Sequence, residues 1–166
     1  LMANRIGRID PDTFDVQLFT PPLVGPRRMR FAADGTLWIP GFGSGTLVRL
    51  DTKTMEYRSY IIPSLAGDES EAPYAVGVHP ETREVWITAN MSDRMFRFLP
   101  EEERFIAYPL PTRGIFLRDI IFTPKGWVCA ASSPVPAALT VEGGMQEILC
   151  IDPEGEKTST AKHDLK

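Results

Sequence analysis

Leu37-Trp38-Ile39 opens the stretch that decides the fold, which continues through Leu47-Val48-Arg49-Leu50 to Tyr60-Ile61-Ile62-Pro63. The same pattern returns further along as Val85-Trp86-Ile87, Met95-Phe96-Arg97-Phe98 and Tyr108-Pro109-Leu110-Pro111. Trp38 and Trp86, Arg49 and Arg97, and Pro63 and Pro111 are each 48 residues apart, and Pro26 and Pro73 are 47 apart. Four landmarks that keep nearly one spacing indicate an internal structural repeat.

Less complete copies of the pattern flank these two units. A third unit runs from Leu117-Arg118-Asp119-Ile120 through Gly126-Trp127-Val128-Cys129 to Ile148-Leu149-Cys150-Ile151. Near the start of the chain, Arg5-Ile6-Gly7-Arg8-Ile9-Asp10 and Val16-Gln17-Leu18-Phe19 match only the second half of the pattern. The 166 residues therefore hold about 3.5 units.

Each unit consists of short runs rich in Val, Ile, Phe, Tyr and Trp, separated by turn signals such as Asp34-Gly35. Four short strands in a unit of this length are typical of one β-propeller blade. A β-sandwich is the alternative, but it gives no reason for the fixed spacing. We predict an all-β propeller of four-stranded antiparallel blades, with a half blade at 4–21 and blades at 25–63, 72–111 and 117–160.

In the first blade, the inner strand is expected at Arg28 to Phe31. The next strands are expected at Leu37 to Pro40, Leu47 to Leu50 and Tyr57 to Ile61.

The composition narrows the classes of partner. With 43% hydrophobic and 24% charged residues, the chain has the make-up of a folded domain. A net charge of −4 and an isoelectric point near 5.2 favour neither nucleic acid nor an anionic membrane as partner. No apolar run approaches the roughly 18 residues of a membrane span. The 15 prolines and 13 glycines argue against long helices.

At several of these positions the sequence resembles the streptogramin lyase (virginiamycin B lyase) propellers. Asn4-Arg5-Ile6-Gly7-Arg8-Ile9 is similar to their N-R/K-I-G-R-I/L element, and Leu37-Trp38-Ile39 and Val85-Trp86-Ile87 are similar to their L-W-F strand. The Pro26 and Pro73 segments resemble their P-H/Y/F-x-I/V blade openings, and Tyr108-Pro109-Leu110-Pro111 resembles their E-Y-x-I/L-P ending. The resemblance covers nearly the whole chain except an insertion around 132–144.

The resemblance implies a chemistry that can be compared with this sequence position by position. Enzymes of the family linearise a cyclic depsipeptide antibiotic by magnesium-assisted β-elimination, with a blade-opening His as base and a Glu after the L-W-F strand on the metal. The blade-opening positions here hold Arg27, Tyr74 and Arg118. The positions after the strand hold Pro40-Gly41, Thr88-Ala89 and Ala131-Ser132. This stretch has neither the His nor the Glu, so Mg²⁺ is implied by the family alone and the catalytic residues are unknown.

Arg27, Tyr74 and Arg118 nonetheless predict a ligand site. They belong to the starts of three successive inner strands, which line one mouth of the central channel of a propeller. Guanidinium groups and a phenol suit an anionic or carbonyl-bearing small molecule. The alternative is that these side chains are solvated at the rim and paired with acids such as Asp119.

Other polar residues favour structural roles. His79 precedes Pro80 in a turn and is expected to be exposed. His163 lies in a polar tail. Because the two histidines are far apart in the sequence, they predict no metal site. Asp68-Glu69-Ser70-Glu71 is expected to be a solvated surface run, with a calcium site as the alternative. Arg8, Arg49 and Arg97 recur at one repeat position, which points to stapling between blades.

The two cysteines replace repeat residues of the third blade. Cys129 stands where the other blades have Trp, and Cys150 where they have the recurrent Arg. Paired departures on adjacent strands predict a cross-strand disulfide, and hence an oxidising compartment, periplasmic or outside the cell. The alternative is two buried free thiols.

Two function classes follow. One is a lyase or hydrolase acting on a cyclic or ester-bearing small molecule; the other is a binding propeller without chemistry. The family implies seven blades, and closed propellers typically need four to eight, so the length predicts a truncated parent chain or self-association of two copies to complete a ring.

Overall fold

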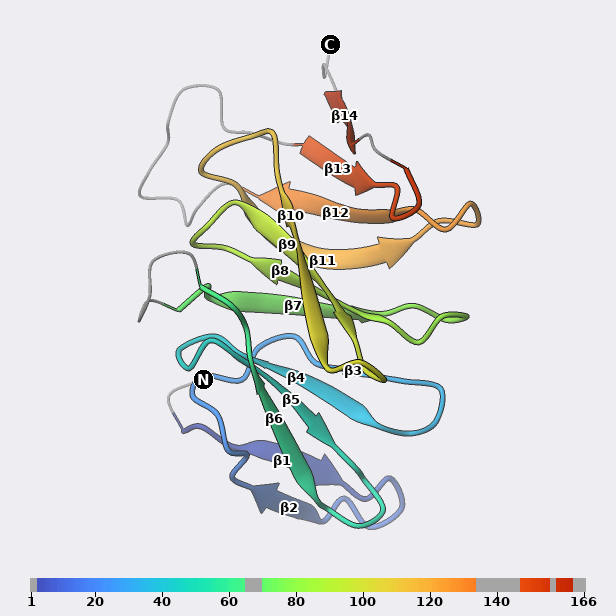
Figure 1. The fold of residues 1–166 in the computed structure, drawn as a ribbon. Helices are drawn as coiled ribbons and strands as arrows, with labels where there is room; N and C mark the ends of the chain where they lie inside the picture. Colours follow the sequence, from blue (N-terminus) through green and yellow to red (C-terminus); the bar gives the residue numbers. More distant parts are fainter. Residues whose placement is uncertain (1–2, 65–69, 134–146, 156–157, 163–166) are drawn as a thin grey trace.

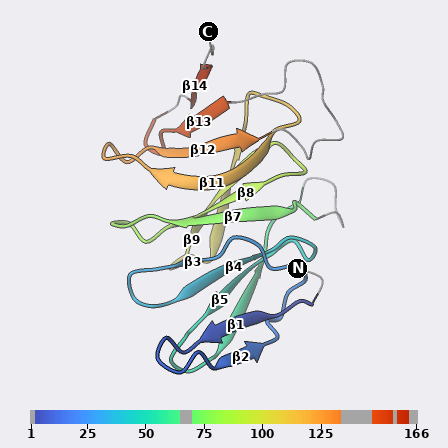
Figure 2. The same cartoon turned by 180° about the vertical axis from the view of Figure 1, so that it is seen from behind.

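The computed structural model describes residues 3–64, 70–133, 147–155 and 158–162, and every regular element in them is a β-strand. Fourteen strands form four antiparallel sheets, each in simple sequence order. The sheets follow one another from the half blade near the N-terminus to the last blade near the C-terminus (Figures 1 and 2). The all-β propeller prediction is confirmed. Among the described residues there is no helix long and apolar enough to cross a membrane.

The strands of each sheet are as follows. The half blade consists of β1 (Ile6–Ile9) and β2 (Val16–Phe19). Blade 1 consists of β3 (Arg30–Phe31), β4 (Leu37–Gly41), β5 (Thr46–Leu50) and β6 (Tyr57–Ile61). Blade 2 consists of β7 (Pro73–Val78), β8 (Val85–Ala89), β9 (Arg94–Leu99) and β10 (Arg104–Pro109). Blade 3 consists of β11 (Phe116–Phe122), β12 (Val128–Ser133), β13 (Glu147–Ile151) and β14 (Thr158–Lys162).

Three apolar layers fill the spaces between successive sheets. Successive side chains of a strand point to opposite faces, so one strand contributes to two layers. On β4, Leu37 and Ile39 pack with Ile6 of the half blade, whereas Trp38 packs against Val85 and other residues of blade 2. Burial on both faces explains why every residue of β4 and β8 is buried.

The inner strands of blades 1 and 2 are joined directly. The backbone N–H of Arg28 donates to the carbonyl of Tyr74 at 3.1 Å, and that of Val76 donates to the carbonyl of Arg28 at 3.3 Å. Arg28 therefore forms a parallel bridge with Ala75 of blade 2, and the inner strand of its own blade is shorter than predicted.

Blades 2 and 3 are joined through a buried amide. Asn90, which follows β8, accepts a bond at Oδ1 from the N–H of Leu117 at 3.0 Å and donates from Nδ2 to its carbonyl at 3.3 Å. Gly77 allows the inner strands to approach, because a Cβ there would lie 2.7 Å from Ile120 Cγ2. The Asn90 bonds hold the start of β11, and the Gly77 contact brings the later parts of β7 and β11 together.

Candidate functional site

The predicted residues Arg27, Tyr74 and Arg118 lie together in the structure. Arg27 precedes β3, Tyr74 is the second residue of β7, and Arg118 is the third residue of β11. The backbone bonds between the blades place these three segments side by side. One blade alone would supply one of the three side chains, so the cluster depends on how the blades stack.

The ring of Tyr74 is the centre of the cluster. The guanidinium carbons of Arg118, Arg27 and Arg28 lie 5.1, 5.7 and 5.8 Å from its centroid. Cations at such distances are attracted to an aromatic ring. We call Arg27, Arg28, Tyr74 and Arg118 the mouth cluster.

Two further aromatic rings complete the packing of the arginines. Arg27 lies 4.5 Å from the centroid of Phe42, and Arg118 lies 4.2 Å from that of Phe116. Tyr74 meets both phenyl rings edge to face, at 6.3 and 5.5 Å between centroids. Since Phe42 and Phe116 come from blades 1 and 3, the arginines are held between rings of neighbouring blades.

The surroundings of Tyr74 favour its ionised form. Burial acts to raise the pKa of the Tyr74 phenol, but hydrogen bonding and the charges of Arg118 and Arg28 outweigh it, so that the pKa lies below its ordinary value. A phenol beside two guanidinium groups therefore loses its proton at a lower pH than an isolated one.

Asp119 does not pair with the residues that the alternative interpretation assigned to it. Its carboxylate forms ion pairs with Arg28 at 3.3 Å and Arg30 at 2.7 Å. Arg118 instead donates from Nε to the hydroxyl of Ser133 at 2.6 Å. Among the described residues, Arg27 Nε is buried without a hydrogen-bond partner. Together with Arg30 and Asp119, the mouth cluster therefore gathers four guanidinium groups and one carboxylate.

Sequence reasoning missed Arg28 and Arg30 as members of this site. The signal available was the basic run Arg27-Arg28-Met29-Arg30 directly after the blade opening. It was not decisive because the repeat pattern singles out one position per blade. The approach of blade 3, which brings Asp119 to both arginines, is a tertiary effect.

The mouth cluster does not suit the magnesium ion that the family resemblance implies. Several guanidinium groups would repel a divalent cation, and the one carboxylate, Asp119, is already bound to two of them. Over the described ranges, no three His, Cys, Asp or Glu side chains lie close enough to hold a metal ion. No step through a metal is therefore derived for these residues.

Two predictions on polar side chains are wrong. His79 is buried, and its Nδ1 accepts backbone N–H bonds from Glu81 and Thr82, so it closes the β7–β8 turn. Glu71 is buried rather than solvated and accepts a hydrogen bond from Ser92. Asp68, Glu69 and His163 lie outside the described residues.

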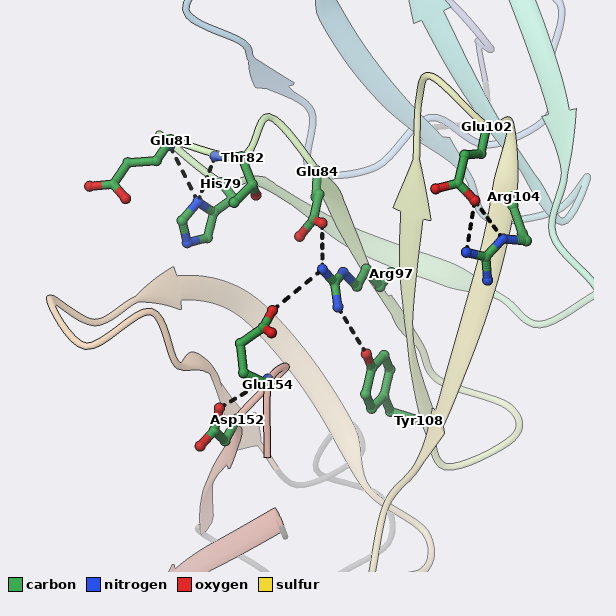
Figure 3. A network of polar contacts seen from close by, with 10 residues as sticks. All are labelled: His79, Glu81, Thr82, Glu84, Arg97, Glu102, Arg104, Tyr108, Asp152 and Glu154. Atoms are coloured by element: carbon green, nitrogen blue, oxygen red, sulfur yellow. Dashed lines mark hydrogen bonds and ion pairs between the residues drawn. The ribbon is translucent and has the colours of Figure 1, made fainter. Parts of the chain in front are cut away.

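The recurrent arginines differ in their contacts. Arg97 binds Glu84 and the hydroxyl of Tyr108 within blade 2, and its Nη2 lies 3.9 Å from Glu154 of blade 3 (Figure 3). Arg8 donates to the side chain of Gln17, on the paired strand of its own half blade, at 2.7 Å in an exposed position. A contact between blades is thus described for Arg97 and not for Arg8.

Cys129 and Cys150 form a disulfide between β12 and β13. The chain has only these two cysteines. Free thiols, the alternative interpretation, are absent from the structure.

Comparison with known structures identifies the same fold in other proteins. Selenomethionine-substituted virginiamycin B lyase from Staphylococcus aureus superposes with a TM-score of 0.79 at 18% identity, over 98% of this chain and 50% of that one. A catalytically inactive variant of that lyase with quinupristin gives 0.78 at 17% identity, over 99% and 50%. The extracellular domain of a hybrid two-component system from B. thetaiotaomicron gives 0.71 at 10% identity, over 99% and 22%. No protein-family model and no curated protein matches the chain.

The resemblance to streptogramin lyase propellers is therefore confirmed as a resemblance of fold. The chain spans about half the length of the virginiamycin B lyase structures that it matches.

Proposed function

We propose that this chain is the ligand-binding part of a propeller, and that its mouth cluster binds a small molecule bearing a carboxylate or a polarised carbonyl. The observation that carries the proposal is the gathering of Arg27, Arg28 and Arg118 around Tyr74 from three blades. Guanidinium groups bind carboxylates through paired hydrogen bonds. The aromatic rings that hold the arginines fix their planes, so less side-chain entropy is lost on binding.

The unpaired donor of Arg27 supports this assignment. Its Nε is buried without a partner among the described residues, and a buried polar group is stabilised by gaining a hydrogen bond. A ligand oxygen near this atom would provide one. Asp119 would remain bound to Arg28 and Arg30 and would keep these two side chains in place.

A lyase activity is the second candidate, and Tyr74 favours it. Tyr74 occupies the blade-opening position where the resembled family has its base, and its pKa is lowered by Arg118 and Arg28 against the opposing effect of burial. In an elimination, the phenolate would remove the proton next to a carbonyl. The freed electron pair would form a C=C bond, and the ester C–O bond would break with release of a carboxylate. Arg118 would stabilise the negative charge that develops on the carbonyl oxygen.

An extracytoplasmic location fits both candidates. The Cys129–Cys150 disulfide persists in oxidising compartments, and one matching structure is an extracellular domain. We therefore propose that the protein acts in the periplasm or outside the cell.

Calorimetric titration of the intact protein with quinupristin and with benzoate tests the binding proposal. The double variant R27A/R118A is expected to weaken binding at least about tenfold, because it removes two charged hydrogen-bond donors. The control R104A changes an exposed arginine of β10 that pairs with Glu102 and should bind like wild type. Equal affinity of wild type and R27A/R118A, or no binding of either probe by wild type, would overturn the proposal.

Chromatography of quinupristin after incubation separates the two candidates. A lyase would convert the cyclic compound to a linear isomer, and Y74F would bind the compound but not convert it. A protein that binds the compound and leaves it cyclic is a binding propeller.

A further inference from the structure

We propose that the groove between blades 1 and 2 is a second ligand site, which takes a small molecule carrying a carboxylate or phosphate, with Arg49 as the residue that binds the anion. This groove is distinct from the mouth cluster. Tyr74 lies at the start of β7, whereas the groove is lined by Val78 and His79 at its end.

The groove has a volume of about 680 Å³, which is within the usual range for small-molecule sites. Its walls are the β3–β4 turn of blade 1 and the β7–β8 and β9–β10 turns of blade 2. Arg49 and Tyr60 line the side of blade 1, and Arg83 lines the side of blade 2.

The repeat provides an internal comparison for Arg49, because Arg97 holds the same position in blade 2. Arg49 lies opposite Trp38 on β4, and Arg97 lies opposite Trp86 on β8. Figure 3 shows that Arg97 binds the carboxylate of Glu84 and the hydroxyl of Tyr108, with Glu154 of the next blade nearby. The charge of Arg97 is therefore neutralised by acids of the protein itself.

Arg49 lacks the main partner that Arg97 has. Glu84 stands two residues before Trp86, and the residue two before Trp38 is Thr36, whose side chain cannot carry the charge. Tyr60 takes the place of Tyr108 and lines the same groove as Arg49. Blade 1 therefore has the tyrosine that corresponds to Tyr108 but no carboxylate that corresponds to Glu84. The side chain of Arg49 is exposed in the groove.

The charged neighbours of Arg49 in the groove do not form an ion pair with it. Arg58 lies directly opposite Arg49 on β6, and like charges at such a pair are unfavourable. Glu103 of blade 2 is bound to Arg58. Among the described residues, no ion pair within 4.0 Å satisfies Arg49 or Arg83.

The remaining titratable groups of the groove are Asp34, Glu101 and His79. The carboxylate of Asp34 accepts the backbone N–H of Thr36 at 2.9 Å, and Nδ1 of His79 accepts two backbone bonds of its turn. Asp34 feels the charges of Arg49 and Arg83, but no contact within ion-pair distance joins them. A ligand anion at Arg49 would stand where Glu84 stands in blade 2.

The other surfaces of the groove suit an apolar part of the same ligand. Phe31 is 66% exposed, and Pro80 and Pro100 lie on the opposite wall. An aryl or alkyl group attached to the anion would bury these surfaces. The expected class is therefore a small organic acid or phosphate ester, and not a free inorganic ion.

Calorimetric titration of the whole protein with benzoate, phenyl phosphate and inorganic phosphate tests the assignment, with R27A/R118A as the starting protein so that the mouth cluster does not contribute. At least one aryl probe is expected to bind below about 10 mM, and inorganic phosphate more weakly. Stronger binding of benzoate identifies a carboxylate site, and stronger binding of phenyl phosphate a phosphate site.

Two variants locate this binding. T36E places a carboxylate at the position in blade 1 that Glu84 has in blade 2. This carboxylate should pair with Arg49 and reduce the affinity for the aryl probes at least about tenfold. The thermal unfolding temperature of T36E should stay at or above that of the parent. R49Q should reduce it equally by removing the donor. R8Q, at the same repeat position in the half blade, should leave it unchanged. The proposal is overturned if neither aryl probe binds, or if R49Q binds them as the parent does.

Discussion

Cys129 on β12 lies directly opposite Cys150 on β13, at the register position where Trp38 faces Arg49 in blade 1 and Trp86 faces Arg97 in blade 2. In the first two blades this pair points toward the next blade, and Trp38 and Trp86 belong to the apolar layers there. A disulfide replaces the Trp–Arg pair in blade 3. It holds two strands together without needing a neighbouring blade to cover a large ring.

Reduction of this disulfide is expected to destabilise the protein by about 3 kcal/mol, the chain-entropy value for a loop of this size. The two cysteines are 21 residues apart. Urea unfolding with and without dithiothreitol measures the difference, and the C129A/C150A variant should unfold at the same urea concentration in both conditions. An unchanged midpoint for reduced wild type would contradict the prediction.

Tyr74 is expected to lose its proton before Tyr57 and Tyr60. Burial raises the pKa of Tyr57 and, as the largest of several effects, that of Tyr60, whereas Arg118 and Arg28 hold the pKa of Tyr74 below 10.0 despite its own burial. Alkaline titration followed by tyrosinate absorbance should show an early step that is absent in Y74F and moves to higher pH in R118A.

The same shift makes stability depend on pH. A folded-state pKa that is lower than the unfolded one adds stability above the unfolded pKa, and this is lost as the pH falls through the folded value. The stability of wild type relative to Y74F should therefore rise as the pH approaches and passes 10.0, the ordinary pKa of a tyrosine. A difference that does not change over this alkaline range would contradict the assignment of the charges.

Asn90→Ala is expected to cost about 2–3 kcal/mol of unfolding free energy, because a buried N–H and a buried carbonyl would lose their partner. Both belong to Leu117, which is 1% exposed. Chemical denaturation measures the loss, with S59A on the exposed strand β6 as a control that should unfold like wild type. A loss of the same size in S59A would argue against the role of the amide.

The outward faces of the first and last sheets predict self-association. Val16 and Leu18 are 57% and 59% exposed on the half blade, and Ile121 and Ile148 are exposed on blade 3. Blades pack face to face, so the blade 3 face of one copy can cover the half-blade face of another. Light scattering should give a mass above the monomer for wild type and the monomer mass for the L18K/I148K variant.

Much of the fold could be predicted from the sequence because each repeat is marked by short strand and turn motifs. The 48-residue spacing, the strand runs and the turn dipeptides gave the strands of blade 1 to within a few residues, apart from the short β3. The cysteine pairing was likewise visible, because both departures from the repeat fall at facing positions of adjacent strands. Local periodicity did not predict the burial of His79 and Glu71, which depends on neighbouring chain segments.

The sequence by itself determined the blade architecture, the blade-opening positions of Arg27, Tyr74 and Arg118, and the facing cysteines, because alternation along a strand and the pairing of adjacent strands follow from residues close in the chain. Only the tertiary structure decided which arginines surround Tyr74 and that Asp119 pairs with Arg28 and Arg30. These contacts join different blades. They depend on how closely separate sheets approach, which no local pattern encodes.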